Sequence, residues 1–377
     1  MSDIEINGLC PPQLSAVRDA FAANFAEGAE LGARFSACVD GELILDIRGG
    51  FADRRREKPW AEDTLVPIFS STKAIAALLV ARAAGEGLID YSAKVTSLWP
   101  EFGQHGKDVL TIEQALSHQA GLAGFSEPVD PDLWFDWDGM CSRIAATAPL
   151  WPPGTASGYH PATFGYIAGE IFRRATGRTF GQALREDISG PLGLDVWIGL
   201  PDSEHDRVAE IQKPPGPALI GELTPIKRAA FYNAWSAPPR GQTPEWRRAE
   251  LPSANGHARG PDLARLMGAM ASDGVLHGQE VLAPGTPAEA ARARICGDDL
   301  VLPFDLCWGA GFLRNERLNI YGPGANSFGH SGWGGSCVFA DPDRRLSGAY
   351  VMNKQSVHLI GDPRPVRLIE ALYAALG

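Results

Sequence analysis

Ser70-Ser71-Thr72-Lys73, followed by Ala74-Ile75-Ala76-Ala77-Leu78-Leu79-Val80-Ala81, is the stretch that decides the fold. The run after Lys73 consists of helix-forming and almost entirely apolar residues, so it predicts a buried helix. Residues three apart share a helix face, which brings Ser70 and Lys73 together. Burial and the positive end of the helix dipole both favour the neutral form of this lysine. A neutral amine beside a hydroxyl is a general base beside a nucleophile.

The Ser-x-x-Lys pattern is short and also occurs by chance. In most such cases the serine caps a helix and the lysine is solvated. The apolar residues after Lys73 favour the catalytic interpretation, because a solvated lysine does not usually open a helix that has no polar face.

The composition is that of a globular enzyme, with 377 residues, of which 45% are hydrophobic and 21% charged. This length predicts two lobes and a large core. The net charge of −11 and the lack of long Lys/Arg runs argue against nucleic acid and membrane surfaces as partners. No apolar stretch reaches membrane-span length, and the acidic start is unlike a signal peptide, so we expect a cytoplasmic protein. The oligomeric state stays open.

The cysteines and histidines indicate neither a metal site nor a cofactor. The histidines show no His-Glu-x-x-His arrangement, and no two cysteines form a Cys-x-x-Cys pair. We expect the six cysteines to be reduced and mostly buried: Cys10, Cys38, Cys141, Cys296, Cys307 and Cys337.

Hairpin signals occur near both ends of the chain. Asp40-Gly41 separates the apolar runs 35–39 and 42–47, and residues 341–344 separate the strand-like runs 336–340 and 346–352. A further short strand is predicted at 308–312. Helices are predicted over 13–25, 111–118, 162–176, 179–188, 261–273 and 363–376, and His118 is expected to cap the turn after its helix.

These elements predict an α+β fold in which an antiparallel sheet is built from both ends of the chain and flanked by helices. We expect a discontinuous sheet domain, residues 1–74 and 300–377, and a mostly helical inserted domain, residues 75–299. The active site is expected in the cleft between them.

Two further segments carry candidate site residues. Tyr159 follows the turn Trp151–Gly154 and precedes a predicted helix, so its phenol can point into a cleft and relay a proton. The glycine-dense segment 329–335 lets the backbone approach a ligand and offer an N–H to an oxyanion. Each also has a structural alternative, namely a packed tyrosine and a tight bend between strands.

Gly329-His330-Ser331-Gly332 looks like the start of the nucleophile elbow Gly-x-Ser-x-Gly. The fifth position is Trp333, however, and no helix pattern follows. Ser331 is therefore not expected to be the nucleophile.

The order Ser70-x-x-Lys73, Tyr159 and His330-Ser331-Gly332 resembles the serine β-lactamase and penicillin-binding-protein superfamily. Within it, the chain is most similar to the class C-like branch and its family VIII carboxylesterases. The segments Leu110–Leu122, Pro153–Gly154 and Trp308–Gly311 are also similar to segments of this branch.

The resemblance implies a role for each matched residue. Ser70 would be acylated, and Lys73 and Tyr159 would share the work of general base and proton shuttle. The oxyanion hole would consist of the backbone N–H groups of Ser70 and Trp333. His330, Ser331 and Gly332 would support the substrate.

Two departures from the β-lactamase pattern favour a neutral ester as the substrate. Pro161 stands where β-lactamases have an asparagine, and it has no side-chain amide to hold a β-lactam. His330 replaces their lysine and is mostly neutral near pH 7, which weakens recognition of a substrate carboxylate. Aromatic loop residues are candidates for lining an acyl pocket: Trp134, Phe135, Trp137, Phe231, Tyr232, Trp235, Trp246 and Trp333.

We therefore predict a serine carboxylesterase for short-chain esters. The alternatives are a β-lactamase or D-amino-acid peptidase with the same acylation site, or an acyltransferase. A non-catalytic scaffold is disfavoured because Ser70, Lys73 and Tyr159 are all present. The physiological ester, its acyl chain length and the stereochemical preference stay open.

Overall fold

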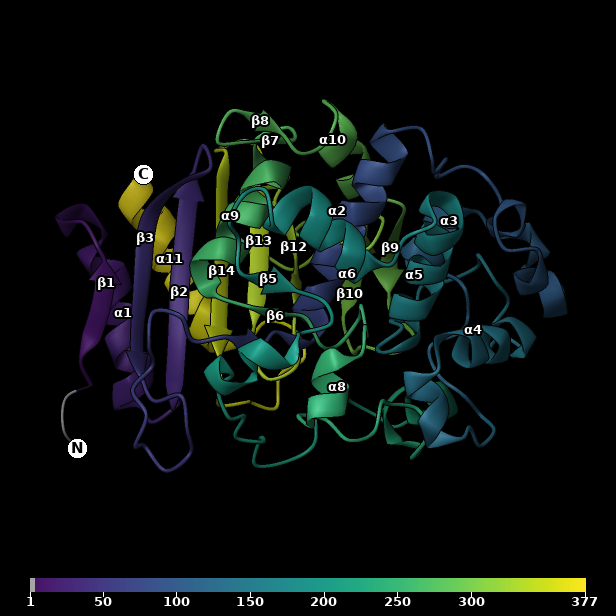
Figure 1. Ribbon diagram of the computed structural model, residues 1–377, viewed down its shortest axis with the longest axis horizontal. Coiled ribbons are helices and arrows are strands. Elements are labelled where there is room, and N and C mark those ends of the chain that lie inside the picture. Colours follow the sequence, from purple (N-terminus) through teal and green to yellow (C-terminus); the bar gives the residue numbers. More distant parts are fainter. Residues whose placement is uncertain (1–3) are drawn as a thin grey trace.

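The computed structural model describes residues 4–377, and its main element is a nine-stranded antiparallel sheet (Figure 1). The strand order is β1-β3-β2-β14-β13-β12-β11-β10-β9. Three strands come from the beginning of the described chain: β1 (Ile6–Leu9), β2 (Gly32–Val39) and β3 (Glu42–Gly50). The other six come from its last part: β9 (Ile295–Asp298), β10 (Asp305–Trp308), β11 (Leu313–Arg314), β12 (Phe328–Ser331), β13 (Cys337–Asp341) and β14 (Leu346–Met352). The predicted α+β fold with a sheet built from both ends is confirmed.

The alternation of side chains along the strands divides the sheet between two hydrophobic cores. Val338 and Val351 belong to the core that contains the helices α2 (Thr72–Gly85) and α9 (Gly260–Ala271). Their neighbours Phe339 and Tyr350 belong to the core that contains α1 (Ser15–Ala26) and α11 (Pro363–Leu376). Helices therefore cover both faces of the sheet.

The two predicted hairpins are confirmed. Val39 pairs with Glu42 across Asp40-Gly41, and Asp341 pairs with Leu346 in the second hairpin. The strand predicted at 308–312 is wrong in its position. β10 ends at Trp308 and β11 begins at Leu313, because the glycine-rich segment between them turns, with Gly311 at φ 83°.

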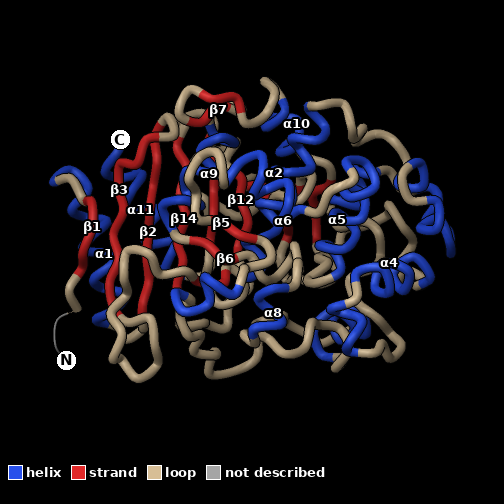
Figure 2. The backbone as a smooth tube through the Cα atoms, viewed as in Figure 1, coloured by secondary structure: helices blue, strands red, loops and turns tan. Residues whose placement is uncertain are grey.

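The remaining helices are α3 (Ile112–Leu116), α4 (Trp137–Ala146), α5 (Thr163–Thr176), α6 (Phe180–Ala183), α7 (Pro225–Lys227), α8 (Pro244–Arg248) and α10 (Thr286–Ala291). Of these helices, α4 and α5 lie toward the end of the molecule opposite the two termini, whereas α6, α8 and α10 lie nearer its middle (Figure 2). A three-stranded sheet consists of β4 (Val66–Pro67), β6 (His257–Ala258) and β5 (Val196–Trp197), in that order. A two-stranded sheet consists of β7 (Val275–Leu276) and β8 (Gln279–Glu280). The division into two domains stays a prediction. Within residues 4–377, no helix has the length and apolar character needed to span a membrane.

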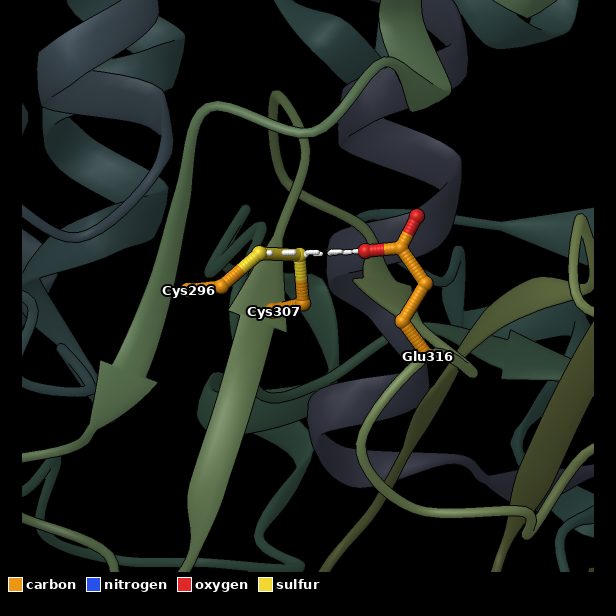
Figure 3. A group of neighbouring side chains, drawn as sticks. All are labelled: Cys296, Cys307 and Glu316. Carbon is orange, nitrogen blue, oxygen red and sulfur yellow. Dashed lines mark hydrogen bonds between the residues drawn. A yellow bond between two sulfur atoms is a disulfide. The ribbon is translucent and has the colours of Figure 1, made fainter.

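The expectation that all six cysteines are reduced is wrong. Cys296 on β9 and Cys307 on β10 face each other in register and form a disulfide (Figure 3). The physical reason is the antiparallel pairing of β9 with β10, which brings their Cα atoms to 4.0 Å and which the spacing of the two cysteines does not reveal. The other cysteines are free, and all of them except Cys10 are buried.

Candidate active site

Ser70 lies in the short 3₁₀ turn Phe69–Ser71, immediately before the buried helix α2. Phe69 has a left-handed backbone with φ 48°, a strained conformation for a bulky residue. The Thr72 hydroxyl donates a 2.5 Å hydrogen bond to the Phe69 carbonyl, and the Phe69 ring packs edge-on against Trp333, with 6.4 Å between ring centroids. These contacts fix the Ser70 hydroxyl at the start of the helix that the sequence predicts.

The Lys73 side chain is fully buried, and its Nζ lies 3.1 Å from Ser70 Oγ. Nζ also donates to two backbone carbonyls, at 2.7 Å to Pro161 and at 3.0 Å to Ser253. Burial lowers the pKa of Lys73 well below its ordinary value. A neutral amine has two N–H groups and one lone pair. Because the two carbonyls take the N–H groups, the lone pair is left for the Ser70 hydroxyl.

The Tyr159 ring lies against the same amine. Its centroid is 4.9 Å from Lys73 Nζ, and the residue is buried. Burial raises the pKa of Tyr159 above its ordinary value, although a side-chain hydrogen bond with Ser70 acts in the opposite direction. The phenol therefore stays protonated at neutral pH, which suits a proton donor better than a phenolate base.

The glycine-rich segment after β12 approaches the turn that holds Ser70. A Cβ on Gly332 would lie 2.4 Å from the Ile68 carbonyl oxygen and 3.2 Å from the Ser70 nitrogen, so the position requires glycine. The Ser336 hydroxyl ties the two segments together with a 2.7 Å hydrogen bond to the same carbonyl. The backbone N–H groups of Ser70 and Trp333 donate to no residue within 4–377, which leaves both free for a ligand.

His330 is buried beside these groups. Its Nδ1 lies 2.8 Å from the Ser331 carbonyl oxygen, and its ring centroid is 6.0 Å from that of Tyr159. Burial, the largest cause, lowers the pKa of His330 to about 3. His330 is therefore neutral at physiological pH. The Ser331 hydroxyl lies 3.3 Å from the Tyr321 hydroxyl, so its partner is a phenol and not the lysine amine.

A small cavity connects most of the predicted site residues. Ser70, Tyr159, His330, Ser331 and Trp333 line it, and the rest of its wall is apolar: Leu302, Leu313, Leu359 and Ile360. Its volume of about 10 Å³ holds about one water molecule. Lys73 lies behind Ser70, outside this lining. Trp333 is the only one of the eight aromatic candidates in the wall, whereas Trp134, Phe135 and Trp137 line a separate cavity of about 190 Å³.

A model of the family described as "Beta-lactamase" matches residues 17–371. The chain belongs to the β-lactamase family. Esterase/beta-lactamase LipL of Mycobacterium tuberculosis is 33% identical over 92% of this chain and 82% of its own length. A penicillin-binding protein homolog from Caulobacter crescentus has 59% identity and a TM-score of 0.96, over 98% of this chain and 100% of its own. A family VIII carboxylesterase has 43% identity and a TM-score of 0.92 over the same shares of the two chains.

Membership makes the protein a serine hydrolase of the β-lactamase fold, and the substrate is not fixed by these comparisons. The two departures from the β-lactamase pattern have a structural consequence within the family. Pro161 contributes its backbone carbonyl to Lys73, and it has no side-chain amide to offer a substrate. His330 carries no positive charge to attract a substrate carboxylate.

His118 is a site neighbour that the sequence assigned to a structural turn. It does follow α3 in a left-handed conformation, with φ 64°. Its ring also packs against Tyr159 and Trp308, with 5.1 Å and 4.4 Å between ring centroids. Its carbonyl accepts the Gly158 N–H at 3.0 Å. No signal in the sequence links His118 to Tyr159, because the contact joins two distant segments.

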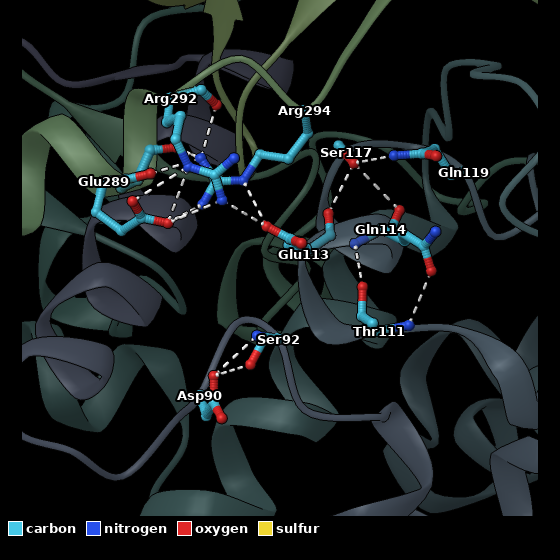
Figure 4. A network of polar contacts seen from close by, with 11 residues as sticks. Asp90, Ser92, Thr111, Glu113, Gln114, Ser117, Gln119, Glu289, Arg292 and Arg294 are labelled. Carbon is cyan, nitrogen blue, oxygen red and sulfur yellow. Dashed lines mark hydrogen bonds and ion pairs between the residues drawn. The ribbon is translucent and has the colours of Figure 1, made fainter.

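Polar contacts anchor the short helix that precedes His118 (Figure 4). Thr111 and Gln114 form a reciprocal capping box at its beginning. Glu113 pairs with Arg292 at 2.9 Å and with Arg294 at 3.3 Å, which ties the helix to the segment before β9. These contacts therefore hold the segment 111–118, which carries the His118 ring to Tyr159.

One cluster within residues 4–377 has the ligand types of a metal site. Ligand atoms of Cys296, Cys307 and Glu316 lie within 4.8 Å of one another. The two sulfur atoms are bonded to each other, however, so they offer no thiolate, and the cluster does not fit a metal ion in this oxidation state.

Proposed function

We propose that this protein is a serine carboxylesterase that hydrolyses short-chain carboxylic esters through an acyl-enzyme on Ser70. The observation that carries the proposal is the environment of the Lys73 amine. It is buried, its two N–H groups are used by carbonyls, and it lies 3.1 Å from the Ser70 hydroxyl. This arrangement favours a neutral amine that accepts the serine proton.

In acylation, Ser70 Oγ attacks the ester carbonyl carbon while its proton moves to Lys73 Nζ. The carbonyl oxygen becomes an oxyanion, and the free backbone N–H groups of Ser70 and Trp333 are the donors proposed to stabilise it. The alkoxide then leaves with the phenol proton of Tyr159. The resulting phenolate recovers a proton from the Lys73 ammonium, so both groups end acylation in their starting forms.

Deacylation repeats these steps with water as the nucleophile. Water loses a proton to the Lys73 amine as it attacks the acyl carbonyl, and Ser70 Oγ is the leaving group. Oγ takes a proton from the phenol, and the phenolate is again restored by the ammonium. The carboxylic acid is released and the free enzyme is regenerated.

Three features support an ester over a substrate with a carboxylate. His330 is neutral, Pro161 provides no amide side chain, and the cavity wall is largely apolar. The similarity to a family VIII carboxylesterase and to a protein named Esterase/beta-lactamase points in the same direction.

Hydrolysis of β-lactams is the second candidate. It is favoured by the name of the Mycobacterium tuberculosis relative and by the similarity to a penicillin-binding protein homolog. The same acylation steps would also serve a D-amino-acid peptidase, or an acyltransferase that excludes water from the acyl-enzyme.

The test is a chain-length series of p-nitrophenyl esters with the wild type and Ser70→Ala. We expect Ser70→Ala to lose on the order of 10⁴-fold or more in turnover, while Ser331→Ala keeps a substantial fraction. Mass spectrometry should place the adduct of an organophosphonate on Ser70. Parallel assays with nitrocefin and a D-alanyl peptide separate the alternatives. Undiminished hydrolysis by Ser70→Ala, or an adduct elsewhere, would contradict the proposal.

A further inference from the structure

Asp299 lies beneath Tyr159, in the turn that connects β9 with β10. It is buried, and its Oδ1 accepts three backbone N–H groups at 2.9 Å each, from Tyr159, Val301 and Leu302. Its Oδ2 accepts the indole N–H of Trp308 at 3.2 Å. Burial raises the pKa of Asp299, but all four partners are donors, which act in the opposite direction and favour the ionised carboxylate.

The same carboxylate holds Tyr159 from two directions. It binds the Tyr159 backbone directly, and it also holds the Trp308 indole, whose ring stacks on the phenol ring. The two rings are nearly parallel, with an interplanar angle of 10° and 5.9 Å between centroids. One buried group thus fixes both the main chain of Tyr159 and the surface on which its ring rests.

The turn also shapes the cavity. Leu302 is one of the wall residues, and its N–H belongs to the three that Asp299 accepts. The Leu300 N–H donates to the Ser157 carbonyl at 3.0 Å, which joins the turn to the segment that leads into Tyr159. Asp299 therefore lies where the β9–β10 turn, the Tyr159 segment and the cavity wall meet.

We propose that Asp299 is a positioning residue that holds the Tyr159 phenol in place to deliver its proton to the leaving alcohol. The inference rests on the proposed function, because it assigns a proton-donor role to Tyr159. The negative charge of Asp299 also favours a phenol that can donate its proton. Besides burial, this carboxylate raises the pKa of Tyr159, which keeps the phenol protonated.

The experiment compares two esters with one acyl group, ethyl butyrate and p-nitrophenyl butyrate. Ethoxide needs a proton to leave, whereas p-nitrophenolate leaves without one. For Asp299→Asn we expect kcat/KM to fall about 10²-fold on the ethyl ester. On the p-nitrophenyl ester the expected loss in kcat/KM is less than about 10-fold, because kcat/KM reports acylation and p-nitrophenolate leaves in that step without the phenol proton. A purely structural defect would lower both values equally.

Two further variants keep the test decisive. Trp308→Phe retains the stacked ring but loses the indole N–H, so it should show the same leaving-group pattern with a smaller loss of about 10-fold on the ethyl ester. It provides the readout if Asp299→Asn does not fold, as judged by thermal unfolding. Asp53→Asn is the matched control, because Asp53 is buried and accepts the N–H groups of Glu57 and Lys58 at 2.9 and 2.8 Å in a turn that forms no part of the cavity wall. For Asp53→Asn, the ratio of kcat/KM on the ethyl ester to kcat/KM on the p-nitrophenyl ester should equal that of the wild type.

Equal losses on both esters, or no loss, would overturn the role of Asp299 while leaving the esterase proposal intact. A wild-type protein that hydrolyses neither ester would overturn the proposed function, and the Asp299 role with it. A loss concentrated on the ethyl ester in both Asp299→Asn and Trp308→Phe would support the inference.

Discussion

Lys73 and Lys107 are two fully buried lysines in different environments. Each lies over an aromatic ring, at 4.9 Å from the Tyr159 centroid for Lys73 and 5.6 Å from the Phe102 centroid for Lys107. Each donates to backbone carbonyls, Lys107 to that of Thr147 at 2.7 Å. Burial lowers the pKa of both, to about 8 for Lys107 and well below 10.5 for Lys73.

The difference between them is the hydroxyl. Lys73 lies 3.1 Å from Ser70 Oγ, three residues earlier in the chain, whereas the residue three before Lys107 is Gln104. Burial by itself makes an amine easier to deprotonate. Only the additional contact with a hydroxyl, next to free backbone N–H groups, turns that property into a possible catalytic function.

Replacing each lysine by methionine gives the largest expected contrast. Lys73→Met should lower kcat/KM for p-nitrophenyl butyrate by roughly 10³- to 10⁴-fold, because Ser70 loses its base. Lys107→Met should keep kcat/KM within about twofold of the wild type, because the Lys107 amine contacts the Thr147 carbonyl and Lys107 is not one of the residues that line the Ser70 cavity. Similar losses in the two variants would show that the amines do not differ in function.

The aromatic ring beside Lys73 carries a hydroxyl, whereas the ring beside Lys107 belongs to a phenylalanine, and removing the hydroxyl tests this second difference. Tyr159→Phe should lower kcat by about 10²- to 10³-fold, with KM changed by no more than about threefold. The ring keeps its stacking on Trp308, so thermal unfolding should change little. Steady-state kinetics with ethyl butyrate provides the measurement, and a wild-type rate would remove Tyr159 from the proton relay.

The smallest effect concerns stability and pH. Between the lowered pKa of folded Lys73 and 10.5, the unfolded chain binds a proton that the folded protein does not. The free energy of unfolding therefore rises with pH in this window, by up to about 1.4 kcal/mol per pH unit. Lys73→Met lacks this contribution, whereas Lys107 contributes equally to both proteins. In urea unfolding, the free energy of unfolding of the wild type relative to that of Lys73→Met should be higher at pH 10 than at pH 7. An equal change in both proteins would contradict a neutral Lys73 amine.

The sequence predicts those parts of the molecule that depend on local spacing. The contact of Ser70 with Lys73 follows from helical periodicity, and the hairpin at Asp40-Gly41 follows from turn chemistry. Tyr159 and the segment 329–335 have weaker local signals, and only their order along the chain, through the family resemblance, connects them to Ser70.

The contacts between distant segments were not predictable in the same way. Asp299 and Trp308 surround Tyr159 through a hairpin whose register is set by the whole sheet. The same register explains the missed disulfide between Cys296 and Cys307. A one-residue slip in pairing would turn these side chains to the other face, and no single segment specifies against it.

The shared sheet also has a consequence for biosynthesis. β2 pairs with β14, and Ser70 emerges from the ribosome long before β12 and Trp333 are made. A nascent chain can therefore present the serine and its lysine without the second donor proposed for the oxyanion. Premature termination upstream of residue 328 should yield protein without hydrolytic power, so the arrangement couples the onset of reactivity to the completion of translation.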